Sequence, residues 1–292
     1  MDDDCLARQF EAHRIRLRAV AYRMLGSLSE ADDAVQESWL RLSRADTTGV
    51  ADLGSWLTTV VARVCLDMLR ARSSRREEPL GTHVPEPIVS RDGAADPEYE
   101  AMVSDAVGLG LLVVLDTLTP GERLAFVLHD MFAGPFDEIG SIVGRSPAAA
   151  RQLASRGRRR VRQSGAVPLG DPARQQAVVG AFLAAARGGD FDALLALLHP
   201  EVALRADAGG PTVSMRLRGA RTVAEKAFAF SPRAGFARPA LVNGAAGIVA
   251  AVGGQPVAVL GFTVADGKIT QIDILADPVR LRGLDLAVLD AS

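Results

Sequence analysis

The sequence predicts a multidomain fold in which two all-α domains precede a C-terminal α+β domain. Apolar residues recur at the helical spacings of three and four through about residue 164. Segments rich in proline, glycine and polar residues interrupt the chain at about residues 75–104 and 164–172. Beyond them, apolar stretches of strand length flank Asp266-Gly267, a pair typical of a two-residue hairpin turn.

Composition and charge narrow the class of protein. The chain has 292 residues, 48% of them apolar, and a net charge of −2, so nucleic-acid binding would depend on local patches. The acidic start, MDDDC, has no apolar segment of signal-peptide type, and no apolar run has the length of a membrane span. Cys5 and Cys65 show neither metal nor redox spacing. We expect a cytoplasmic protein with reduced thiols and no membrane partner.

The first domain, residues 6–74, is predicted to contain three helices. Gly26 ends the first helix, and Ser29 followed by Asp32 predicts a capping box at the start of the second. Apolar residues at helical spacing form the inner face of this second helix. Its outer face carries Asp33, Gln36, Glu37 and Arg41.

A loop over residues 45–54 leads to the third helix of this domain, residues 56–72, which Ser55 is expected to cap. Arg63, Asp67 and Arg70 share one face, where they could form ion pairs. The helix runs into further arginines, which suit either a nucleic-acid surface or a solvated helix end. The following linker, residues 75–104, carries four prolines and is expected to be extended.

The second domain, residues 105–164, is predicted to be a helix-turn-helix domain. Gly144 can end one helix in the left-handed conformation, and Ser146 and Pro147 suit the start of the next. Seven arginines and no acidic residue lie between Ile139 and Gly165, which indicates an anionic partner such as DNA. We expect base contacts from Arg151 and Gln152 and phosphate contacts from later basic residues. The predicted DNA-contacting set is Arg145, Arg151, Gln152, Ser155, Arg156, Arg158 and Arg159.

The third domain, residues 171–292, is predicted to place helices first and a curled antiparallel sheet after them. His199, Asp207 and Asp273 are its acid–base candidates. None of them forms a nucleophile–base pair or a metal-binding pattern that the sequence reveals. Asp207 suits a turn and Asp273 a solvent-facing position. We therefore expect no catalytic residue, metal or cofactor.

Two blocks of the sequence resemble extracytoplasmic function (ECF) sigma factors. EADDAVQESWLRL and GSWLTTVVARVCLDMLRAR are similar to region 2, and the sequence from LTPGERLAF to ASRGRRRVR is similar to region 4. The resemblance implies that Asp33, Gln36 and Glu37 bind core RNA polymerase. It also implies that residues 45–70 read and melt the −10 element and that region 4 reads the −35 element. The −10 contacts expected from position are Thr47, Thr48, Asp52, Arg63 and Arg70.

A subgroup of these sigma factors carries a fused SnoaL-like, NTF2-type C-terminal domain, and three short motifs resemble that subgroup. They are His83-Val84-Pro85-Glu86-Pro87 in the linker, Asp207-Ala208-Gly209-Gly210, and Asp277-Pro278-Val279-Arg280-Leu281. The resemblance implies that the extension regulates the sigma part from within the chain. We expect regulatory contacts from Pro85, Glu86, Pro87, Asp207, Gly209, Gly210, Asp277 and Pro278.

The function predicted from the sequence is promoter-directed transcription initiation with core RNA polymerase and promoter DNA as partners, by a chain that is a monomer when free. Two alternatives stay open at this point. One is a one-component DNA-binding regulator whose C-terminal pocket holds a small-molecule ligand. The other is an active cyclase or isomerase in the third domain. The acidic outer face of the second helix favours the sigma factor, because a lone repressor needs no polymerase-binding surface.

Overall fold

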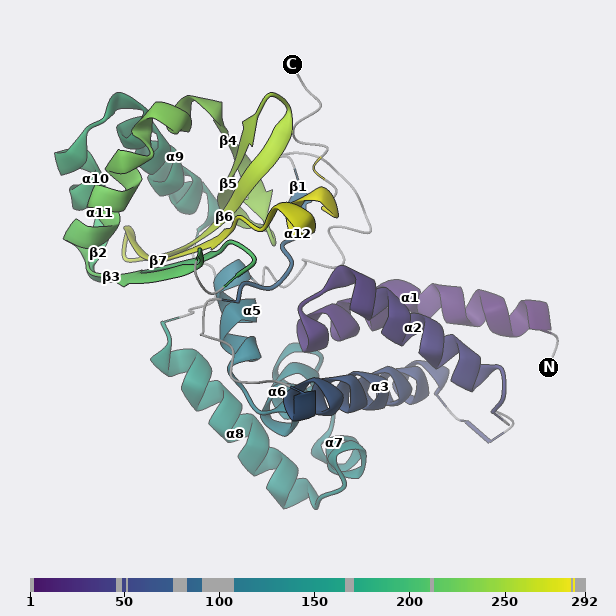
Figure 1. The fold of residues 1–292 in the computed structure, drawn as a ribbon. Coiled ribbons are helices and arrows are strands. Elements are labelled where there is room, and N and C mark those ends of the chain that lie inside the picture. Colours follow the sequence, from purple (N-terminus) through teal and green to yellow (C-terminus); the bar gives the residue numbers. More distant parts are fainter. Residues whose placement is uncertain are drawn as a thin grey trace. The chain divides into compact units, whose positions relative to one another are not determined.

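The computed structural model describes residues 3–45, 49–50, 52–75, 83–90, 108–165, 171–210, 213–284 and 286. These residues form two compact units (Figure 1). The helical unit contains the described residues up to Arg75 and those from Val114 to Ser164. The sheet unit contains residues 83–90 and 108–113 and the described residues from 165 onward.

The helical unit begins with three long helices, α1 (Asp3–Leu25), α2 (Leu28–Leu42) and α3 (Leu53–Arg75). Gly26 follows α1 with a φ of 73°, as expected for a glycine that ends a helix. Both predicted starts differ from the structure. Ser27, two residues before Ser29, caps α2 by accepting a hydrogen bond from the Glu30 amide. Helix α3 starts before Ser55, because the Asp52 carboxylate already accepts from the Gly54 amide at 2.9 Å.

The second half of the helical unit contains the predicted helix-turn-helix, α7 (Phe136–Val143) and α8 (Pro147–Gln163). Gly144 adopts the left-handed conformation with a φ of 70°, and the Ser146 side chain accepts from the Ala149 amide. These local signals were all visible in the sequence, and the prediction of the motif is confirmed. Helix α6 (Pro120–Phe126), which starts with a complete capping box, and a π-helical turn, η1 (Val127–Met131), precede the motif.

The sheet unit is built on a seven-stranded sheet with helices packed on both of its faces (Figure 1). Its helices are α9 (Pro172–Gly188), α10 (Phe191–Leu197), α11 (Ala220–Ala229), η2 (Ser231–Phe236) and α12 (Pro278–Arg282). The strand order is β1-β4-β5-β6-β7-β2-β3. The strands are β1 (Val89–Ser90), β2 (Leu198–Asp207), β3 (Met215–Arg218), β4 (Ala237–Val242), β5 (Ala245–Val252), β6 (Gln255–Ala265) and β7 (Lys268–Leu275).

The α+β class of this unit is as predicted, and so is the turn at Asp266-Gly267, where both residues have positive φ. One strand pair departs from the expected antiparallel sheet, because β2 runs parallel to β7. After β2 the chain passes through β3 and α11 to β4, near the opposite edge of the sheet. It then returns through β5 and β6 to β7, which runs in the same direction as β2.

The two faces of this sheet belong to different apolar cores. Leu204, Phe262 and Ile272 lie on the inner face and pack with Phe182 and Leu194 of the covering helices. The outer face is packed by segments from three parts of the chain. Its buried core comprises Val84, Leu109, Ala240, Val242, Val249, Val259, Leu275 and Leu281.

Two of those segments precede the C-terminal domain in the sequence. Residues 83–90, from the predicted extended linker, include β1, which pairs antiparallel with β4 at the edge of the sheet. Helix α5 (Leu109–Asp116) starts in the sheet unit, and its last residues, from Val114, belong to the helical unit. Residues 83–90 and 109–113 join the sheet unit because they cover apolar side chains on its outer face.

Candidate functional site

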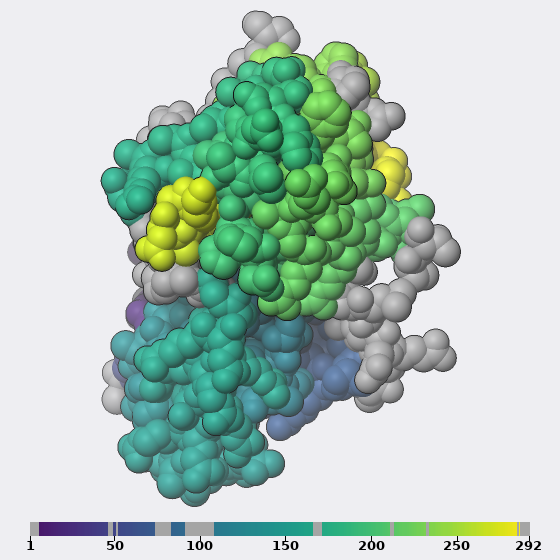
Figure 2. Space-filling view, turned by 90° about the vertical axis from the view of Figure 1, so that its left-hand side faces the viewer, coloured from purple at the N-terminus to yellow at the C-terminus, as the bar shows by residue number. Residues whose placement is uncertain are grey.

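Helix α8 presents the basic surface expected of a DNA-reading helix. Ala150, Ala154 and Gly157 are buried against the rest of the helical unit, whereas Arg151, Gln152, Ser155 and Arg159 are exposed. Figure 2 views the molecule from the side on which α8 lies, and the rest of its own unit leaves this teal surface open. The exposed side chains are therefore free to approach the groove of a DNA duplex.

The arginines of this surface are not equivalent. Arg158 pairs with Asp130 at 2.6 Å, and Arg156 lies 4.0 Å from Glu122. Burial raises the pKa of the Asp130 carboxyl, and the positive charge of the nearby Arg158 acts against this rise. Arg145 and Arg159 are exposed and have no carboxylate partner in the described part of the chain. Arg145 and Arg159 are thus better placed to bind phosphates than Arg156 and Arg158.

Glu122, the acidic residue of the capping box that starts α6, also has a second structural role. Its side chain is 4% exposed, and it receives a hydrogen bond from Arg160 at 2.8 Å as well as one from the Thr119 amide. This ion pair joins α6 to α8 over 38 residues of chain, so no local sequence signal announces it. It helps to fix the recognition helix on its own domain.

Only part of the predicted −10 surface lies within the described residues. Thr47 and Thr48 lie outside them. Asp52 is exposed and accepts hydrogen bonds from Ser55 Oγ at 2.6 Å and from the Gly54 amide, which lower the pKa of its carboxyl. Its carboxylate therefore stabilises the start of α3. Arg63 and Arg70 are exposed on α3, and Arg70 lies 3.8 Å from Asp67.

Arg72, on the same helix, has a different task. Its side chain donates to Glu30 at 3.1 Å and to the Leu25 carbonyl at 3.1 Å. It therefore ties α3 to α2 and to the end of α1. Arg72 therefore fits neither the nucleic-acid surface nor the solvated helix end that the sequence suggested for these arginines.

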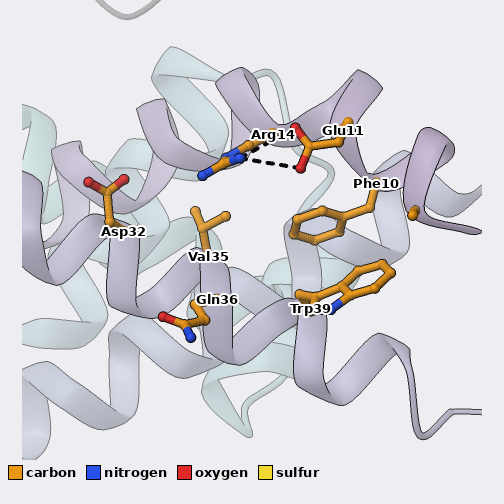
Figure 3. Close-up of a pocket in the computed structure, with 8 residues that line it drawn as sticks. Phe10, Glu11, Arg14, Asp32, Val35, Gln36 and Trp39 are labelled. Atoms are coloured by element: carbon orange, nitrogen blue, oxygen red, sulfur yellow. Dashed lines mark hydrogen bonds and ion pairs between the residues drawn. The ribbon is translucent and has the colours of Figure 1, made fainter.

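The predicted polymerase-binding residues lie on the exposed side of α2. Asp33 and Gln36 are exposed, and Glu37 pairs with Arg41 at 2.9 Å. Gln36 also borders a groove of about 270 Å³ between α1 and α2, whose floor includes Phe10 and Trp39 with ring centroids 5.1 Å apart. Figure 3 shows the two rings at one end of the groove and Asp32 at the other. The surface combines acidic and amide groups with an apolar floor, a combination typical of a protein interface.

The three motifs expected to make regulatory contacts come together on the outer face of the sheet unit. Asp207 Oδ2 accepts from the Val84 amide at 3.0 Å and from Arg280 Nη1 at 2.7 Å. Arg280 Nη2 donates to the Val84 carbonyl at 2.6 Å. One arginine and one carboxylate thus hold both backbone polar groups of Val84, whose side chain is fully buried. We call this arrangement of Val84, Asp207 and Arg280 the linker clasp.

The remaining predicted residues support the clasp. Pro85 and Pro87 are buried and Glu86 is half-buried. Gly209 has a φ of 86°, and a Cβ there would lie 2.8 Å from Asp277 Cγ, so glycine is required on two grounds. Asp277 caps α12, in which Pro278 is the first residue, by accepting from the Val279 amide at 2.8 Å. A Cβ on Gly210 would lie at an ordinary distance of 3.8 Å from Val213 Cγ2.

The electrostatics of Asp207 suit a permanently charged anchor. Burial acts to raise the pKa of its carboxyl, but hydrogen bonds from His83 and from the Val84 and Gly209 amides, with the charge of Arg280, lower it from 3.8 to about 2. The stabilisation that the charged Asp207 gives the clasp is therefore complete above pH 3.8, the ordinary pKa of the carboxyl, and is lost only as pH falls toward 2. Arg280 was not among the predicted contacts, because its helix lies 73 residues from Asp207 in the chain.

The three acid–base candidates lie in different surroundings within the sheet unit. His199 is exposed, whereas Asp207 and Asp273 lie on the outer face, away from the apolar core beneath the helices. Asp273 is 1% exposed, which contradicts the expected solvent-facing position. Its strand is central in the sheet, with α5 packed over this face, so water does not reach it. Among the described residues, no group of three His, Cys, Asp or Glu side chains could hold a metal ion.

Comparisons with known proteins agree with this organisation. The family described as Sigma-70 region 2 matches residues 9–75, and Sigma-70, region 4 matches residues 109–161. "ECF RNA polymerase sigma factor SigJ" of Mycobacterium tuberculosis is 41% identical over 95% of this chain and 94% of its own. "Probable ECF RNA polymerase sigma factor SigI" of the same species is 34% identical, again over 95% of both chains.

Among solved structures, the crystal structure of SigJ from Mycobacterium tuberculosis matches with a TM-score of 0.79 and 39% identity. The match covers 96% of this chain and 99% of SigJ, so it includes the C-terminal domain. Helical promoter-recognition domains followed by an α+β cone define a sigma factor with a fused C-terminal domain. The chain belongs to the ECF RNA polymerase sigma factors.

Proposed function

We propose that this chain joins core RNA polymerase, directs it to a promoter, and restrains its own activity by holding its linker on the C-terminal domain. The observation that carries the proposal is the linker clasp, in which Arg280 and Asp207 hold the backbone of Val84. A linker between two DNA-reading domains must follow the path that the polymerase gives it. Residues 83–90 belong to this linker, and they cannot take that path while β1 is paired with β4 in the C-terminal sheet.

The outer face of α2 supports the assignment of the polymerase surface. Asp33 and Gln36 are exposed, and the neighbouring groove offers apolar area that a partner helix could cover. Within the part of the chain that the structure describes, the Asp33 side chain makes no hydrogen bond or ion pair. An exposed acidic residue with no structural task is well suited to an intermolecular contact.

The test is charge reversal on this face. Asp33→Lys with Glu37→Lys should weaken binding to core RNA polymerase in a fluorescence titration, because like charges would then face the partner. The matched control is Asp192→Lys with Glu225→Lys, which makes the same charge change at two exposed residues of the sheet unit. Equal affinities for the two double variants would refute the assigned surface.

DNA contacts are proposed on the same basis. Arg151 and Gln152, in the early part of α8, would read base edges of the −35 element, while Arg145 and Arg159 would bind phosphates. Arg63 and Arg70 would hold the −10 strand. Asp52, Arg156 and Arg158 have structural partners and would contribute less.

We also infer that the C-terminal domain acts by contact and not by catalysis. Phe182 and Phe262 meet edge to face in the inner core with ring centroids 5.5 Å apart, and apolar side chains surround them. The two acidic candidates on strands, Asp207 and Asp273, lie on the outer face instead. No helix in the described ranges is long and apolar enough to cross a membrane. A monomer in the cytoplasm is the state in which such a factor would meet polymerase.

A further inference from the structure

The start of α5 rests on the outer face of the sheet unit, separately from the linker clasp. Leu109 is 2% exposed and belongs to the apolar core of that face. The residues from Val114 onward, in the same helix, belong to the helical unit, and the match to Sigma-70, region 4 begins at residue 109. The first turn of region 4 is thus part of the C-terminal domain's core.

Two glycines make this contact unusually close. A Cβ on Gly110 would lie 2.5 Å from Thr263 Oγ1, and a Cβ on Gly261 would lie 2.9 Å from Leu109 Cβ. One glycine lies on the helix and the other on β6, so each surface omits the side chain that would separate them. Such mutual fitting is typical of a specific seat and not of incidental contact.

A buried acid, Asp273, also borders the contact between α5 and β6. Asp273 Oδ2 is 3.7 Å from the position that a Gly110 Cβ would take, and Gln271 donates to this oxygen at 2.6 Å. Among the described residues, Asp273 Oδ1 has no hydrogen-bond partner, and Nε of Arg205 lies 3.9 Å away. Covering a carboxylate that is incompletely hydrogen-bonded costs free energy, and exposing it to water would recover that cost.

From these contacts we propose that the outer face of the sheet is a latch for the first turn of α5. The seat formed by Gly261, Thr263 and Asp273 holds Leu109 and Gly110 in the restrained chain and releases them when region 4 engages a promoter. The proposal extends the restraint proposed above from the linker to region 4 itself, and it rests on that proposed function. Its partner is a segment of the same chain, residues 109–113.

The latch has a predictable dependence on pH. Burial raises the pKa of Asp273 from 3.8 to about 6, against the opposing effects of Arg205, Gln271 and Arg216. The elements facing it contribute Arg205 from β2 and Arg216 from β3, while β6 and α5 contribute the uncharged Thr263 and Gly110. Because the docked state favours the protonated acid, docking is strongest at low pH and weakens as pH rises through about 6.

Hydrogen exchange of the amides of residues 111–113 in the full chain measures the latch without polymerase. Gly110→Ala improves helix propensity, which alone would raise the protection factor about fivefold. The latch predicts the opposite sign, a loss of about tenfold or more, because the new methyl group meets Thr263. Thr263→Ala in the same chain should restore protection, since it removes the colliding oxygen.

Gly180→Ala is the matched control, because Gly180 is a helical glycine of the same unit with open space around it, and it should leave residues 111–113 unchanged. Between about pH 5 and pH 7.5, protection corrected for intrinsic exchange should fall by up to about tenfold, and Asp273→Asn should abolish this fall. Higher protection in Gly110→Ala, or pH dependence that persists in Asp273→Asn, would overturn the latch. Neither result bears on polymerase binding by α2.

Discussion

Gly157 is an unfavourable residue for the middle of a helix, yet it lies where α8 packs tightly against α6. A Cβ at this position would be 3.0 Å from Phe126 Cβ and 3.3 Å from the Glu122 carbonyl oxygen. The sequence alone gives a cost of about 1 kcal/mol for this glycine and no benefit. The benefit lies in the packing: the missing side chain lets the recognition helix approach its support and keeps Arg160 within reach of Glu122.

Gly157→Ala should therefore destabilise the helical unit by about 1–2 kcal/mol despite its better helix propensity, because the collision involves a rigid helix backbone and a Cβ atom. Trp39 and Trp56 are the chain's two tryptophans and both lie in this unit, so urea unfolding followed by tryptophan fluorescence reports on it alone. The control is Gly121→Ala, whose Cβ would meet Leu153 at an ordinary 3.6 Å. A Gly157 variant as stable as this control would refute the packing argument.

At the scale of elements, predictions succeeded where the signal was local. The turn between α7 and α8 is encoded by Gly144, Ser146 and Pro147, and each takes its expected place. Strands β4 and β5 went unpredicted because their residues are mostly alanine, glycine and isolated apolar side chains with weak strand preference. The turns that follow these strands do carry a signal, Asn243-Gly244 after β4 and Gly253-Gly254 after β5. All four turn residues have positive φ.

The recognition helix gives the prediction that belongs to this scale. Arg151 lies in the first turns of α8 with its guanidinium 5.0 Å from the Phe136 ring centroid, and Arg159 lies two turns later without a carboxylate partner in the described residues. Arg151→Ala should relax base preference at the −35 element. Arg159→Ala should weaken binding to all sequences and reduce the salt dependence by about one phosphate contact.

Binding of labelled duplexes by the polymerase-bound chain, measured over a range of salt concentrations, separates the two effects. The comparison needs one promoter duplex and one duplex with a changed −35 element. Equal loss of discrimination in both variants would mean that base and phosphate contacts have been assigned to the wrong ends of the helix.

At the scale of the whole molecule, the sequence indicated which segments matter but not how they are grouped. Residues 83–90 read as an extended linker, and residues 109–113 read as the start of the second DNA-binding domain. In the structure both segments complete the outer face of the C-terminal sheet. Such long-range pairing leaves little trace in a single sequence, because β1 has two residues and the Arg280 contacts span 73 and 196 positions.

On the whole-molecule scale, we expect the C-terminal domain to restrain the sigma factor by holding its linker. Transcription in vitro with core polymerase and the full-length chain tests it most directly, comparing Arg280→Ala with the native protein. Arg282→Ala, an exposed arginine on the same short helix, is the control. Loss of the Arg280 contacts to Asp207 and to the Val84 carbonyl should free the linker and raise transcript yield severalfold, while the control stays at the native level. Native transcript yield from Arg280→Ala, at equal occupancy of the polymerase, would contradict the account.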